Sequence, residues 1–144
     1  MKAEMRKYRF EDHISDAKFE AFGDTLEQAF ESAALALISL MWDRKVVESR
    51  IEYGVKVTGR DEKQLLVAFL EEILFLRDAK SFLLSQVDGI RIDRKKSICI
   101  LRAFFRGQTY SESVPTYGDV KAVTYNEMKI EHNGQFRIQV VVDL

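Results

Sequence analysis

The chain has 144 residues, of which 47% are hydrophobic and 31% are charged. This composition is typical of a folded protein and excludes a disordered one, so we expect a single compact domain over residues 1–144. The formal net charge is −1, from 22 basic and 23 acidic residues. Proteins that bind nucleic acid directly usually carry a basic excess that neutralises phosphates, so this balance disfavours such binding.

No segment has the pattern of a signal peptide or a membrane span. The first residues, MKAEMRKYRFED, lack the apolar stretch that a secretory signal needs. The longest apolar stretches, residues 33–40 and 65–70, are too short to cross a bilayer. A single cysteine excludes an internal disulfide. These features predict a cytoplasmic protein that does not enter a membrane.

The first half of the chain predicts strands and two helices. Residues 7–13 and 16–22 alternate apolar and polar side chains, which indicates two strands joined by a short turn. Thr25 and Gln28 form a capping box, and apolar residues follow at helical spacing as far as Met41. Residues 50–58 alternate again, and Asp61 with Gln64 repeats the capping pattern before a second apolar helix.

The second half predicts strands alone, over residues 83–87, 90–93, 97–105, 119–131 and 136–142. Asn133-Gly134 indicates a hairpin with a type I′ turn, and Asp88-Gly89 gives the same signal between the first two of these strands. Residues 94–96 are expected at a hairpin tip. The predicted fold class is α+β, with two helices packed on a largely antiparallel sheet.

The familiar catalytic patterns are missing. The sequence has neither a phosphate-binding loop nor a dinucleotide fingerprint, and its Cys and His residues number three: His13, Cys99 and His132. A zinc site built from such residues is therefore disfavoured. Cys99 lies in an apolar strand, where a packed thiol is the usual interpretation. We therefore expect a protein that is not an enzyme.

Two segments indicate possible metal chemistry. Residues 12–16 gather Asp12, His13 and Asp16 at the first turn, and a core-type strand runs directly into Asp143-Leu144. Calcium prefers oxygen ligands, so two aspartates with a main-chain or terminal oxygen would suit it. An aspartate in a turn more commonly caps the backbone, so both interpretations remain open from the residues alone.

Three separated motifs resemble the archease family. Residues 8–16 (YRFEDHISD) with residues 21–30 (AFGDTLEQAF) resemble the family's opening, residues 121–128 (KAVTYNEM) its second signature, and residues 140–144 (VVVDL) its ending. The turn at residues 13–16 differs from the family's usual His-Thr-Ala-Asp in its two middle positions. Asn126 stands where a histidine is frequent.

The resemblance implies an accessory protein that activates the tRNA-splicing RNA ligase. Archeases promote guanylylation of the ligase's active-site histidine and so support multiple turnover. The resemblance also implies a bound divalent ion, calcium, with Asp16, Asp143 and Leu144 as ligands, the last through a main-chain or terminal oxygen. It further implies roles in activation for Lys121 and His13.

Two other functions remain as alternatives. One is a general chaperone or binding module for nucleic-acid-processing proteins, with the second helix or Phe104-Phe105 as its apolar surface. The other is a small hydrolase that uses Asp16 and His13 with the ion. Catalytic turnover by the purified protein alone would distinguish a hydrolase from the other two functions.

Overall fold

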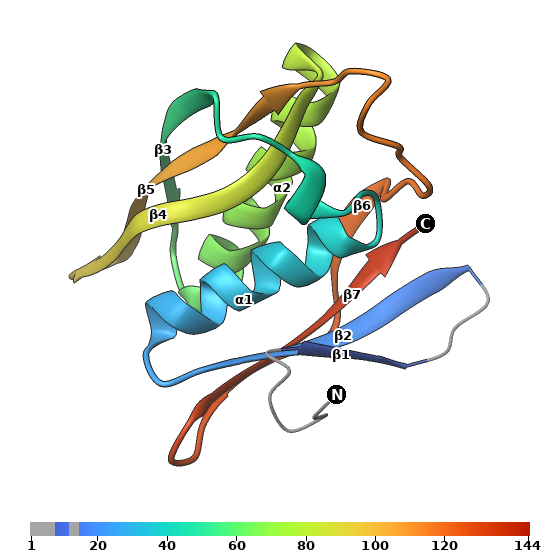
Figure 1. Cartoon of the computed structure of the whole chain (residues 1–144). Coiled ribbons are helices and arrows are strands. Elements are labelled where there is room, and N and C mark those ends of the chain that lie inside the picture. Colours follow the sequence, from blue (N-terminus) through green and yellow to red (C-terminus); the bar gives the residue numbers. More distant parts are fainter. Residues whose placement is uncertain (1–7, 12–14) are drawn as a thin grey trace.

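The computed structural model describes residues 8–11 and 15–144, which form two antiparallel sheets with two helices between them (Figure 1). One sheet has the strand order β1-β2-β7-β6 and the other β3-β5-β4. The fold class predicted from sequence is confirmed, with the strands divided over two sheets. The elements are β1 (Tyr8–Glu11), β2 (Asp16–Gly23), α1 (Leu26–Ser39), the 3₁₀ turn η2 (Arg44–Val46), β3 (Ile51–Gly59), α2 (Glu62–Lys80), β4 (Phe82–Lys95), β5 (Ile98–Thr109), β6 (Ala122–His132) and β7 (Phe136–Asp143).

Both predicted capping boxes are present. The Thr25 hydroxyl accepts a hydrogen bond from the Gln28 amide at 3.1 Å, and the Gln28 side chain accepts one from the amide of the residue before the cap. At α2 the Asp61 carboxylate accepts a hydrogen bond from the Gln64 amide at 2.8 Å, and the Gln64 side chain accepts one from the Arg60 amide. Each box satisfies amides that the first helical turn leaves without a partner.

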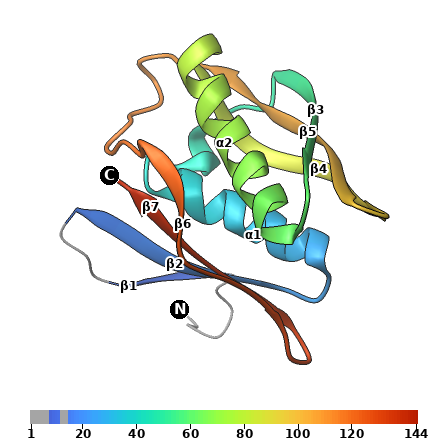
Figure 2. The ribbon, with the colours of Figure 1, turned by 180° about the vertical axis from the view of Figure 1, so that it is seen from behind.

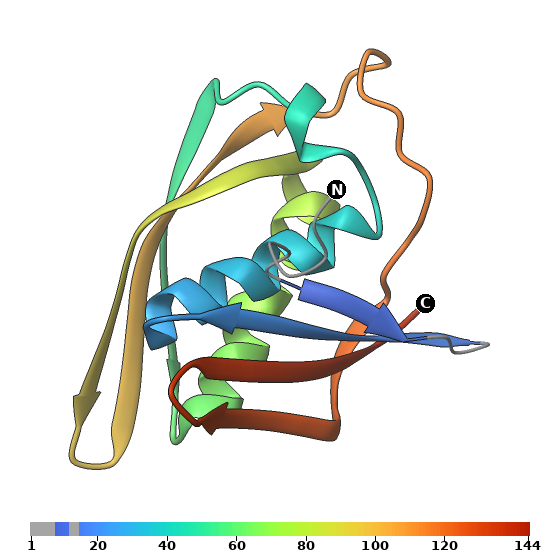
Figure 3. The same ribbon diagram turned by 60° about the horizontal axis from the view of Figure 1, so that its bottom comes forward.

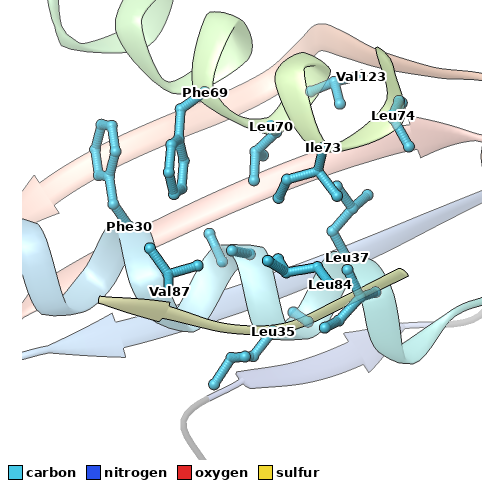
Figure 4. Close-up of a cluster of buried hydrophobic side chains, with 14 of the residues drawn as sticks. Phe30, Leu35, Leu37, Phe69, Leu70, Ile73, Leu74, Leu84, Val87 and Val123 are labelled. Atoms are coloured by element: carbon cyan, nitrogen blue, oxygen red, sulfur yellow. The ribbon is translucent and has the colours of Figure 1, made fainter. Parts of the chain in front are cut away.

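Helix α1 is the more buried helix. It packs on β2 and β7 on one side and on β4 on the other, so apolar residues are buried around most of its circumference. Helix α2 packs on β6 and β3, and Figure 2 shows its outer side uncovered by either sheet. The helices meet through Phe30 and Phe69, whose ring centroids lie 5.7 Å apart (Figure 4). Neither helix is long and apolar enough, within the described part of the chain, to cross a membrane.

Two turn predictions are corrected by the structure. Asp88-Gly89 does not form a hairpin, because β4 runs through it as one strand, with an irregular register opposite β5 between Asp88 and Arg91. Asn133-Gly134 does join β6 to β7, but of these two residues only Gly134 has a positive φ (81°), so the turn is not type I′. The predicted hairpin tip is confirmed, since β4 ends at Lys95 and β5 begins at Ile98.

Candidate functional site

Strand pairing places Asp16 directly opposite Asp143. Asp16 is the first residue of β2 and Asp143 the last of β7, and their α-carbons are register partners in an antiparallel pair. The next register pair, Ser15 with Leu144, is hydrogen-bonded, because the Leu144 amide donates to the Ser15 carbonyl at 3.3 Å. Asp16 and Asp143 therefore form a non-hydrogen-bonded pair, in which α-carbons lie about 4.5 Å apart and side chains share one face. Figure 3 shows the end of β7 beside the start of β2.

The two aspartates face away from the helices. Ala17 and Phe19 alternate with them along β2 and are buried in the core. The side chains of Asp16 and Lys18 consequently lie on the outer face of the sheet. Asp16 is half-buried and Asp143 is exposed.

The start of β6 completes this corner of the sheet. Ala122 is the register partner of Asp143, and the Lys121 amide donates to the Asp143 carbonyl at 2.8 Å. Lys121 is exposed, and within residues 8–11 and 15–144 its ammonium group has no hydrogen-bond or ion-pair partner. Of the residues singled out from sequence, Asp16, Lys121, Asp143 and Leu144 are thus together, while His13 lies outside the described residues.

The donor chemistry of this corner fits a hard divalent cation. Like charges directly opposite each other on a sheet repel, and a shared cation relieves that repulsion. Asp16 and Asp143 carry carboxylates, and Leu144, whose amide bonds to the Ser15 carbonyl, is the residue next to Asp143. Among the described residues no cluster of three or more His, Cys, Asp or Glu side chains forms a metal site. Calcium takes six to eight oxygen ligands, more than these residues alone could offer it.

A distortion of β6 adjoins this corner. The pairing of β6 with β7 shifts between Thr124 and Lys129, and within this bulge Glu127 has a φ of 53°. The buried Gln139 side chain donates to the Glu127 carbonyl at 2.7 Å. The Glu127 carboxylate lies 3.3 Å from the Lys18 ammonium group. Nothing in the sequence indicated this arrangement, because only a few residue types predict a positive φ and glutamate is not one of them.

A buried carboxylate lies further along the same face. Glu20 is 3% exposed and receives ion pairs from Arg9 on β1 and Arg137 on β7. Arg137 also contacts Glu131 on β6 at 2.8 Å. These pairs connect all four strands of the sheet.

Helix α2 covers the free edge of β6. The Val123 amide donates to the Glu71 carboxylate at 2.8 Å. The Glu71 carboxylate is therefore directed to β6, whereas carboxylates on a helix commonly lie on its solvated face. Its neighbour Glu72 is partly buried, and that burial raises the pKa of its carboxyl.

The apolar surface expected for a chaperone is small. Phe105 is fully buried and packs on Phe69, while Phe104 is 48% exposed. Helix α2 buries most of its apolar residues and exposes Phe75. Cys99 is buried, as its apolar strand predicted.

Comparison with known proteins identifies the family. The model of the archease protein family matches residues 8–144. The chain belongs to the archease family. Protein archease of Pyrococcus furiosus is 35% identical over 143 residues, which cover 97% of this chain and 100% of that protein. Protein archease of Methanothermobacter thermautotrophicus is 36% identical over 141 residues, with the same coverage.

A solved archease-like structure has the same fold. The solution structure of protein 1598 of Methanobacterium thermoautotrophicum superimposes with a TM-score of 0.82 at 32% identity, over 97% of this chain and 100% of that one. The resemblance seen in three sequence motifs is therefore confirmed over nearly the whole chain.

Proposed function

We propose that this archease is an accessory protein that activates the RNA ligase of tRNA splicing. It would promote guanylylation of the ligase's active-site histidine and so support repeated turnover. The observation that carries the proposal is the cross-strand pair of Asp16 and Asp143, with Lys121 hydrogen-bonded beside it. Membership of the family supports the choice of partner.

The ion would be held by the carboxylates of Asp16 and Asp143 and by the Leu144 main-chain oxygen. When bound, it would supply positive charge at an exposed corner of the domain. Lys121 lies at the same corner with an ammonium group that no described residue engages. If this corner docks at the ligase's nucleotide site, Lys121 would stabilise the negative charge that develops at the GTP α-phosphate.

The deciding experiment is multiple-turnover ligation by the cognate ligase, with and without this protein. The wild-type protein should accelerate turnover and ligase guanylylation. Asp16→Asn, Asp143→Asn and Lys121→Met should each lower that acceleration by at least about tenfold, since each removes one charge from the corner. Unchanged guanylylation in all three variants would refute the proposal.

Asp24→Asn is the matched control. Asp24 is exposed and follows β2 at the end away from Asp16, so the same change of charge there should leave ligation unaffected. The experiment also tests the two alternatives. Binding of unrelated client proteins without any effect on the ligase would indicate a chaperone, and turnover of a phosphoester by the protein alone would indicate a hydrolase.

A further inference from the structure

An exposed aromatic ring lies on the outer face of the β3-β5-β4 sheet. Ala103 and Phe105 of β5 are buried, so the residue between them, Phe104, is directed away from the helices and is 48% exposed. A Cβ at Gly54 of β3 would lie 3.9 Å from this ring, and one at Gly89 of β4 would lie 3.6 Å from it. Because glycine carries no side chain, neither of these positions covers the ring.

A row of three cations crosses the same face beside Phe104. Arg102 lies two positions before Phe104 on β5. Its register partners are Lys56 of β3 and Arg91 of β4, and all three side chains are exposed. Arg91 lies 3.4 Å from Asp93, whereas no described residue forms an ion pair or hydrogen bond with the side chain of Lys56 or Arg102. Like charges directly opposite each other on a sheet repel, so a bound polyanion would stabilise this row.

The arginine on the other side of Phe104 is neutralised within the fold. Arg106 lies two positions after Phe104 on the same strand. It forms ion pairs with Glu52 of β3 at 3.3 Å and with Asp88 of β4 at 2.6 Å. The uncompensated positive charge is therefore confined to the half of this face that leads to the β4–β5 turn.

The β4–β5 hairpin extends this basic half. Residues 94–96, at the turn, are one arginine and two lysines, and all three are exposed. Figure 2 shows the hairpin projecting beyond both helices. Residues 56–63 and 91–102 together hold eight basic and three acidic residues, a net charge of +5, whereas the whole chain has a net charge of −1. The near-balanced total, which disfavoured nucleic-acid binding, therefore includes a localised basic surface.

We propose that the outer face of the β3-β5-β4 sheet binds single-stranded RNA. An unpaired base would stack on Phe104, and the row of three cations would neutralise backbone phosphates. Single strands fit this face better than duplexes, because the bases of a duplex are already stacked on one another. RNA is inferred because the proposed function places the protein beside an RNA ligase, and on that point alone the inference rests on the proposed function.

The test is fluorescence anisotropy of a labelled single-stranded oligoribonucleotide of about ten nucleotides, titrated with the wild-type protein and its variants. Phe104→Leu should weaken binding at least about fivefold, because the stacked base is lost. Phe104→Tyr keeps an aromatic ring and should retain the wild-type affinity. Arg102→Gln and Lys56→Gln should each weaken binding and flatten the dependence of the logarithm of the binding constant on the logarithm of salt concentration by about 0.7, the contribution of one phosphate contact.

Phe75→Leu and Lys129→Gln are the matched controls. Phe75 is 58% exposed on α2, and Lys129 is exposed on β6 of the other sheet. The same changes of side chain at these positions should leave both the affinity and its salt dependence unaltered. An RNA duplex of the same sequence should bind more weakly than the single strand, since paired bases cannot stack on Phe104. Thermal unfolding checks that each variant remains folded.

Three results would overturn the inference: no RNA binding by the wild-type protein at low salt, equal affinities of Phe104→Leu and Phe75→Leu, or a duplex bound as tightly as the single strand. If Phe104→Leu lowers ligase activation while no RNA is bound, the face docks a protein instead. Ligase activation by the wild-type protein without RNA binding would refute this inference alone. RNA binding through Phe104 without ligase activation would refute the proposed function alone.

Discussion

At the scale of single residues, the most consequential buried charge is Glu20. Its carboxylate is shielded from solvent and paired with two guanidinium groups, from Arg9 and Arg137. Glu20→Gln keeps the shape of the side chain but removes its charge. We expect a loss of about 1–2 kcal/mol in the free energy of unfolding, because hydrogen bonds to charged groups contribute more than neutral ones.

Urea unfolding of Glu20→Gln beside Glu131→Gln measures this difference. Glu131 contacts the same arginine from an exposed position, where ion pairs contribute less than about 1 kcal/mol. Similar urea midpoints for the two variants would show that burial does not increase the contribution of Glu20 to stability.

Glu72 gives a prediction that depends on pH. Burial raises the pKa of its carboxyl above the ordinary value of 4.5, so the folded state holds the proton more tightly than the unfolded state. Stability should therefore fall as pH rises through the ordinary value towards the raised one, and the deficit should persist above it.

Replacement of Glu72 by Gln removes this ionisation. The variant should melt above the wild-type protein at about pH 7 and lose that advantage at about pH 4, where the carboxyl is largely protonated. Glu112→Gln, at an exposed loop position, makes the same change in net charge and should show no such gain. A pH-independent difference would contradict the role of burial.

At the scale of elements, the two strand–helix junctions are built alike. A Cβ at Gly23 would overlap the Ala29 amide, and one at Gly59 would lie 2.5 Å from the Leu65 amide, the equivalent atom of the second junction. Each junction therefore requires glycine because the helix begins directly against the strand.

Gly59→Ala should destabilise the protein by about 1–3 kcal/mol, the usual cost of forcing an extra methyl into a packed site. Gly23→Ala should behave similarly. Gly54→Ala, in the same strand as Gly59, is the control, because its nearest neighbour would be an ordinary 3.9 Å contact with Phe104. Equal urea midpoints for Gly54→Ala and Gly59→Ala would contradict this account.

The elements also show what sequence patterns can and cannot predict. Both helices and their caps were predictable, because capping and helical periodicity are local properties. The two Asx-Gly signals were not equivalent: at Asn133-Gly134 the chain reverses, whereas at Asp88-Gly89 long-range pairing with β5 keeps β4 continuous. Both glycines have a positive φ, so an Asx-Gly dipeptide predicts the backbone conformation of its glycine but not whether the chain reverses there.

The candidate site was predictable only in part. Spacing alone could not place Asp16 beside Asp143, since strands from the two ends of the chain must pair first. The family resemblance named these residues, and the register then placed them together. The pairing of Lys18 with Glu127 had no local signal at all.

At the scale of the whole molecule, the proposed ion would join the starts of β2 and β6 to the end of β7. Such an ion binds the folded state alone and should raise its melting temperature. Calcium at about a hundredfold excess over its dissociation constant should add about 2.7 kcal/mol. Thermal unfolding with calcium, and then with a chelator, measures the shift.

Asp143→Asn should abolish most of this stabilisation, whereas Asp24→Asn should retain it. An equal calcium-dependent shift in both variants would place the ion elsewhere on the molecule. No ligase is needed for this measurement, so it tests the cation site apart from the activity.

The position of α1 between the two sheets determines how the domain can open. Residues on opposite sides of this helix pack on β2 and on β4, so separation of either sheet exposes it to water. Its central backbone amides, over residues 33–37, should then exchange with deuterated solvent only when the entire domain unfolds. The slowest-exchanging protons should therefore report the global stability of the protein.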